Sequence, residues 1–204
     1  MDKKPELSEL EEDLLGELFN LGVGRAANSL SKMVSQEVKL SVPHVKFVGH
    51  DEMEEYLGDN SQICAVGQKM HGPFDAQSLL LFPEKSSMEV VRQMLGEHLS
   101  DELIAEMQQE ALTEIGNIVL NACIGAISNS MRKTITVELP HFFLDTPERL
   151  IKGYLTADSD VVLLITIDMT LSQSEVTGYM AFILGPFSLQ KLQQSLQEML
   201  SGMI

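Results

Sequence analysis

The sequence has no tryptophan, only two cysteines among its 204 residues, and few aromatic side chains, which make up 5% of the chain. Its core must therefore be built from aliphatic residues and from the 12 methionines. Apolar residues make up 44% of the chain, which is typical of a globular protein. Cys64 and Cys123 both lie among apolar residues, so we expect them to be small buried side chains.

Positive charge is also scarce, since 14 Lys and Arg stand against 30 Asp and Glu, for a net charge of -16. Such a chain repels nucleic acid phosphates and anionic membranes, so a protein partner with a basic or metal-loaded patch is the more natural target. Residues 1–15 lack the apolar run of a signal peptide, and the longest apolar stretches, such as Val161–Ile165, are too short to span a bilayer. We therefore expect a cytoplasmic protein without nucleic acid or membrane partners.

The histidines and cysteines show no metal-binding pattern. None of the five histidines has metal-ligand spacing with either cysteine; they are His44, His50, His71, His98 and His141. The sequence therefore predicts no bound metal.

Hydrophobic periodicity predicts a series of helices and strands that occurs twice. Apolar residues at helical spacing predict helices at residues 8–35, 51–57, 84–95, 101–132, 147–151 and 188–200. Alternating or continuous apolar residues predict extended segments at 37–48, 61–70, 76–82, 134–144, 161–169 and 177–184.

The second half of the chain matches the first when the sequence is shifted by 97 residues. The matched pairs are Glu17 with Glu114, Asn20 with Asn117, Pro43 with Pro140, and His44 with His141. This match predicts an internal duplication, with repeats at about 8–97 and 101–204 forming a single domain over residues 1–204. The expected fold is α/β of the α+β type. Two halves related by a pseudo-two-fold axis share one mixed or antiparallel sheet of about six strands, with the two long helices on its surface.

Each long helix carries a narrow polar stripe. The stripes, at i, i+4, i+7 and i+11, are Asp13, Glu17, Asn20 and Gly24 on the first helix and Glu110, Glu114, Asn117 and Asn121 on the second. The opposite faces are apolar and should pack inward; they are Leu15, Phe19, Gly22, Ala26, Leu30 and Met33, and Leu112, Val119, Cys123 and Ile127. Glycines beside the stripes, Gly22, Gly24 and Gly116, indicate close approach by a strand or a docked partner.

An acidic stripe on a helix is usually no more than a solvated face. Two features favour a functional site here: the stripe recurs at the same helical phase, and a proline follows each Asn after 22 intervening residues, at Pro43 and Pro140. Proline cannot donate to a sheet ladder, so both prolines should bend or end a strand near the site. The histidines that follow them, His44 and His141, are expected to have a structural role at this kink.

The segments DLLGELFN and EALTEIGN, each followed by 22 residues and a proline, resemble the signature of the CheC/CheX/FliY family of chemotaxis phosphatases. The resemblance covers essentially the whole chain, and two copies in about 200 residues resemble CheC. CheX has a one-site pattern, and FliY is a longer chain with an added switch domain. Glu110 stands where the family usually has Asp or Ser.

The resemblance implies a phosphatase that hydrolyses the phosphoaspartate of a CheY-type response regulator. It assigns the catalytic roles to Glu17, Asn20, Glu114 and Asn117, supported by Asp13, Pro43, Glu110 and Pro140. Asn would orient the attacking water, as a glutamine does in GTPases, and Glu would meet the active-site lysine of the regulator. The regulator brings its own Mg²⁺, so no cofactor belonging to this chain is implied.

Two other functions fit the same resemblance. The chain could be a binding module with idle sites, like the flagellar switch protein FliM, or an adaptor controlled by the deamidase CheD. Retention of both Glu/Asn pairs favours the enzyme. Glu110 is one methylene longer than Asp, so it either crowds a docking regulator or reaches a basic residue on it. On the first alternative, the site on the first helix is expected to be the more active one.

Overall fold

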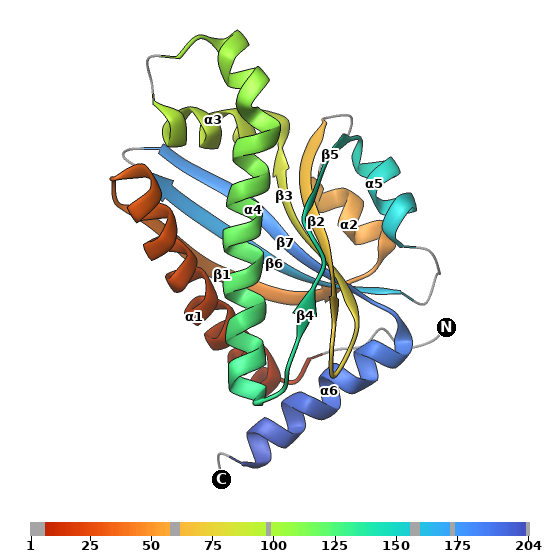
Figure 1. Ribbon diagram of the computed structural model, residues 1–204. Coiled ribbons are helices and arrows are strands. Elements are labelled where there is room, and N and C mark those ends of the chain that lie inside the picture. Colours follow the sequence, from red (N-terminus) through yellow and green to blue (C-terminus); the bar gives the residue numbers. More distant parts are fainter. Residues whose placement is uncertain (1–6, 58–61, 97–98, 156–159, 172–173, 203–204) are drawn as a thin grey trace.

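The computed structural model describes residues 7–57, 62–96, 99–155, 160–171 and 174–202 (Figure 1). The first half contains α1 (Glu9–Val34), β1 (Val38–Val48), α2 (His50–Leu57), β2 (Ile63–His71), β3 (Ala76–Pro83) and α3 (Glu84–Leu95). The second half contains α4 (Asp101–Met131), β4 (Thr136–Val137), β5 (His141–Asp145), α5 (Pro147–Tyr154), β6 (Val161–Leu171), β7 (Ser174–Leu184) and α6 (Pro186–Ser201). The order helix, strand, helix, strand, strand, helix thus occurs twice if β4 and β5 are counted as one interrupted strand.

All expected helices are present, but one expected strand is wrong. Residues 134–144 form two short strands, β4 and β5, with a break at residues 138–140. Pro140 lies in this break, and its lack of an N–H group prevents continuous pairing with β2. The expectation about the prolines is therefore confirmed at this position.

All strands described join one antiparallel sheet, and its order is symmetric between the two halves. The order is β1-β6-β7-β3-β2-β4, with β5 also paired to β2. Exchanging each strand for its counterpart in the other half gives the same order read backwards. The centre of the sheet is the β3–β7 pair, one strand from each half. This arrangement is consistent with an internal duplication about a pseudo-two-fold axis.

Both motif prolines lie at equivalent irregularities of the sheet. In the β1–β6 pair, Ser41 is opposite Asp168 but His44 is opposite Thr166, so β1 has one extra residue around Pro43. On the other side, Val137 is opposite Met70 and His141 is opposite Gly67, so the second half also has one extra residue around Pro140. A bulge of this kind re-aims side chains and frees backbone groups beside a site.

Helices cover both faces of the sheet and divide the core in two. The larger cluster lies under the long helices α1 and α4 and includes apolar residues of α3 and α6, and the smaller cluster lies under α2 and α5. Figure 1 shows α1 and α4 lying side by side across one face and running in opposite directions. The two stripe-bearing helices are thus placed on the same side of the molecule.

Helix α4 is, among the described residues, the only one long and apolar enough to cross a membrane by length and composition. Its apolar side chains pack on the sheet and on α1, where Leu112, Val119 and Leu120 are at most 1% exposed. A buried core helix passes the same test, so its composition is explained by packing.

Candidate functional site

The long helix α1 is fixed at both ends by its own sequence. Ser8 and Glu11 form a capping box in which the Ser8 side chain accepts from the Glu11 N–H and the Glu11 carboxylate accepts from the Ser8 N–H at 2.9 Å. Its last turn is followed by Ser35 in the left-handed conformation. Helix α4 is followed by Arg132 in the same conformation, 97 residues later, so the two helices end at equivalent positions.

Site one, defined as Asp13, Glu17, Asn20 and Pro43, is brought together as the sequence predicted. All four residues line one polar groove of about 330 Å³ between α1 and β1, together with Glu12, Gly16, Val42 and Val45. Asp13, Glu17 and Asn20 are exposed, which confirms that this stripe faces water. The apolar face packs inward as expected except for Met33, which is 47% exposed.

The spacing between Asn20 and Pro43 has a structural cause. The Val42 backbone N–H donates a hydrogen bond to the Asn20 side-chain oxygen at 3.1 Å. Val42 and Pro43 fall in the gap of the β1–β6 register, so this N–H is available to the helix instead of the neighbouring strand. The bond holds the Asn20 carboxamide against the bulge, with its NH₂ group and second oxygen lone pair left for another partner.

Site two, defined as Glu110, Glu114, Asn117 and Pro140, is built differently. Glu110 and Glu114 are exposed, but Asn117 and Asn121 are half-buried. The Asn121 NH₂ group donates to the Asn117 side-chain oxygen at 2.6 Å, and the Asn121 oxygen accepts from the Gln68 NH₂ group of β2 at 3.1 Å. A chain of three amides therefore takes the place of the backbone bond at site one.

Sequence reasoning did not identify Gln68 and gave no role to Asn121. Asn121 falls on Gly24 in the repeat alignment, so the duplication carries no signal for it. Gln68 is 1% exposed, and its side-chain oxygen has no hydrogen-bond partner among the residues that the structure describes. A buried amide is costly unless it is paired, and the bond to Asn121 satisfies the Gln68 NH₂ group.

Two of the stripe glycines mark close contacts within the protein. A side-chain carbon at Gly22 would lie 2.6 Å from the Cys123 Cα, so α1 and α4 meet at this point. A carbon at Gly116 would lie 2.5 Å from the Val66 side chain, so α4 lies directly on β2. Gly24 has no atom within 4 Å of that position. The predicted approach of a strand is therefore confirmed at Gly116, whereas Gly22 meets a helix and Gly24 meets no neighbouring element.

The two cysteines lie in the core. Cys64 and Cys123 are free and buried, as expected, and burial raises the pKa of the Cys123 thiol to about 12. Burial also raises the pKa of Cys64. Within the described ranges, no three His, Cys, Asp or Glu side chains are grouped to hold a metal ion. His44 and His141 are exposed and resume strand pairing after each gap, whereas His98 lies outside the described residues.

The chain is similar in sequence to two curated proteins of Bacillus subtilis. It is 23% identical over 143 residues to the CheY-P phosphatase CheC, covering 68% of both chains. It is also 23% identical over 189 residues to the flagellar motor switch phosphatase FliY. This alignment covers 91% of the present chain and 49% of FliY. The chain thus spans about half the length of FliY. No family model matches the sequence.

Three solved structures have the same fold. Thermotoga maritima FliY superposes with a TM-score of 0.74 at 16% identity, covering 95% of this chain and 98% of the other. The middle domain of FliM from H. pylori superposes with a TM-score of 0.65 at 10% identity, covering 93% of this chain and 99% of the other. CheX in the CheX–CheY–BeF₃–Mg²⁺ complex from Borrelia burgdorferi superposes with a TM-score of 0.50 at 15% identity, covering 82% of this chain and 96% of the other.

The fold of this chain is thus the one found in FliY, in the FliM middle domain and in CheX. In sequence the chain is similar to CheC and FliY of Bacillus subtilis, which are both named as phosphatases, and in fold it is similar to FliY.

Proposed function

We propose that the protein hydrolyses the phosphoaspartate of a CheY-type response regulator, with Asn20 and Asn117 orienting the attacking water and Glu17 and Glu114 docking the regulator. The observation that carries this proposal is site one. There, an exposed Glu and an exposed Asn lie one turn apart beside a bulge, and the bulge holds the Asn carboxamide through the Val42 N–H. The names of the relatives as CheY-P phosphatases support the reaction class.

The Asn side chain suits an acyl phosphate because this substrate is already activated. The catalyst then needs mainly to hold a water in line with phosphorus. At site one, the Val42 N–H occupies one lone pair of the Asn20 oxygen and limits rotation of the amide. The remaining lone pair accepts a hydrogen bond from the water, and the NH₂ group donates one to a phosphoryl oxygen. A neutral amide does this without adding negative charge beside the phosphoryl group.

The Glu side chains suit docking because each is an exposed anion one turn before its Asn. A carboxylate here repels a phosphoryl group unless the partner supplies a cation, and a lysine in the regulator's active site provides one. The Mg²⁺ required by the reaction is carried by the regulator, so this protein contributes no cofactor of its own. Asp13 and Glu110, one turn earlier, extend the same docking face.

Two further parts of the proposal concern partners and location. The protein acts in the cytoplasm, where its strongly acidic surface disfavours nucleic acid and anionic membranes. Control by a CheD-type deamidase is a second function on the same fold, and a FliM-like binding module is the alternative to an enzyme. The likeness to the FliM middle domain supports this alternative only at the level of the fold.

The test is the double substitution Asn20→Ala with Asn117→Ala, assayed by the decay of a phosphorylated CheY-type regulator. We expect the accelerated decay to disappear. The protein should stay folded, because each change removes one side-chain bond worth about 0.5–1.5 kcal/mol and introduces a better helix former.

The matched control is Asn28→Ala with Asn129→Ala, which makes the same chemical change at exposed positions of the same two helices. This control should retain full activity. Decay by the Asn20/Asn117 variant at the rate of the control would refute the water-positioning role and favour the binding module.

A further inference from the structure

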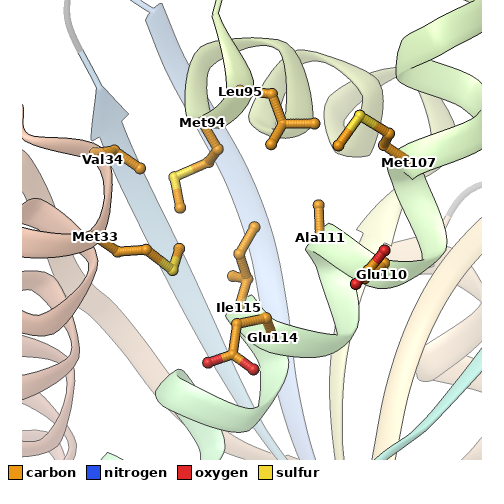
Figure 2. Close-up of a pocket in the computed structure, with 9 residues that line it drawn as sticks. All are labelled: Met33, Val34, Met94, Leu95, Met107, Glu110, Ala111, Glu114 and Ile115. Atoms are coloured by element: carbon orange, nitrogen blue, oxygen red, sulfur yellow. The ribbon is translucent and has the colours of Figure 1, made fainter.

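An apolar groove lies beside site two. It has a volume of about 360 Å³ and lies between the end of α1, the end of α3 and the first half of α4. Figure 2 shows Met33, Met94, Leu95 and Met107 arranged around it, with the carboxylates of Glu110 and Glu114 to one side. Two of the proposed docking residues of site two therefore also line an apolar groove.

The groove reflects a difference between the two halves. Helix α3 has 12 residues, packs on α4 and buries Val90 and Val91, whereas its counterpart α6 has 16 residues, packs on α1 and buries Leu192 and Leu196. Lys133, which follows α4, holds α6 through Glu198 at 3.0 Å. At the other end of the α1–α4 pair, α3 already ends at Leu95. There, Leu95 is 37% exposed, and Met33 of α1 is 47% exposed. The groove at site one is lined mainly by polar side chains and has no methionine.

The charge of the groove is unbalanced. Its two charged lining residues are both glutamates, and in the described part of the chain no lysine or arginine pairs with either of them. Arg92, the cation in the last turn of α3, instead contacts Asp101. Methionine surfaces adapt to different apolar side chains, and unpaired carboxylates at their edge favour a cationic partner.

We propose, on the basis of the proposed function, that the groove is a second contact for the regulator that docks at site two. The regulator inserts a large apolar side chain among Met33, Met94 and Met107 and places a lysine or arginine against Glu110. Site two then holds its partner through Asn117, Glu114 and the groove together, whereas site one has the polar contacts alone. The groove makes site two the tighter docking site.

This proposal reverses the ranking expected from the sequence. That ranking assumed that Glu110 crowds a docking regulator. In the structure, Glu110 is exposed at the edge of the groove, where its extra methylene extends its reach instead of filling the space that the partner needs. Glu110 is accordingly a contact residue for a basic side chain.

The experiment measures binding of a CheY-type regulator activated with Mg²⁺ and beryllofluoride, which is not hydrolysed. The parent protein carries Glu17→Ala, which removes the docking carboxylate of site one, and Met33→Lys is added to it. Met33→Lys places a cation in the groove at an exposed position in the last turn of α1, where it suits the helix dipole. The Kd should rise about tenfold or more, as for loss of a central apolar contact. Glu110→Gln should raise the Kd less and reduce its salt dependence.

The control is Phe187→Lys, which makes the same charge change at an apolar residue of α6 that is 71% exposed and lies away from the groove. Its Kd should equal that of the parent. Equal Kd values for Met33→Lys and Phe187→Lys, with both melting normally, would overturn the groove while leaving the phosphatase proposal intact. If Met33→Lys raises the Kd but the wild-type protein does not accelerate dephosphorylation of the regulator, the phosphatase proposal would be refuted and the groove supported. No binding by the parent at any concentration would refute the regulator as the occupant.

Discussion

The crossing of the two site helices gives the sharpest structural prediction. Gly22→Ala adds one carbon that would lie 2.6 Å from the Cα and 2.9 Å from the Sγ of Cys123. Contacts below 3.0 Å to backbone atoms cannot be relieved by a side-chain rotation, so α1 and α4 must move apart. Gly24→Ala, two residues later on the same helix, meets no atom within 4 Å.

The two substitutions have the same effect on helix propensity but differ in their effect on packing. Both replace glycine by alanine inside α1, which favours the helix by about 1 kcal/mol. Only Gly22→Ala overpacks a tight contact, which typically costs 1–3 kcal/mol. Gly24→Ala should therefore stabilise the protein, and Gly22→Ala should be about 1–3 kcal/mol less stable than Gly24→Ala. For a chain of 204 residues this corresponds to a difference of about 2–12 °C in melting temperature.

Thermal unfolding of the two variants and the parent, followed by circular dichroism, measures this difference. Since the crossing sets how the site helices lie relative to each other, Gly22→Ala should also slow dephosphorylation of the regulator more than Gly24→Ala does. Equal melting temperatures for the two variants would show that the helices do not touch at Gly22, and the described contact would be wrong.

Three other outcomes are expected. Asn121→Ala, in a background with site one silenced, should slow dephosphorylation because Asn117 loses its donor, and should destabilise the protein by about 1–3 kcal/mol; normal turnover would show that the amide chain is only structural. Cys64 and Cys123 should not react with a thiol reagent at pH 8 until the protein is unfolded, when two thiols should appear. Hydrogen bonds from Gln93 and Ser174 lower the pKa of Glu89 below 4.5. Its ionised form therefore stabilises the fold at a pH above the unfolded pKa, and this stabilisation is lost as the pH falls through the folded pKa. In an acid titration, the free energy of unfolding of Glu89→Gln should fall less steeply than that of the parent protein.

The sequence by itself determined most of the helices and strands and the exposed polar face of the first long helix. Helix periodicity, the Ser8 cap and the alternation of Val38, Leu40 and Val42 act over a few residues, so they can be read without knowing the fold. The shift of 97 residues predicted that two equivalent sites exist. It also placed a proline at each, and a proline within a sheet predicts an edge, a strand start or a bulge because it has no N–H group to donate.

Only the tertiary structure decided how the equivalent sites differ. The Val42 N–H reaches Asn20 because β1 returns under α1, and no local pattern encodes that contact. Asn117 instead meets Asn121 and, through it, Gln68 on a strand 53 residues away in sequence from Asn121. The groove beside Glu114 arises where the ends of α1 and α3 meet the first half of α4, since α3 stops a turn earlier than α6. Contacts between distant segments depend on packing of the whole chain, which the duplication constrains but does not specify.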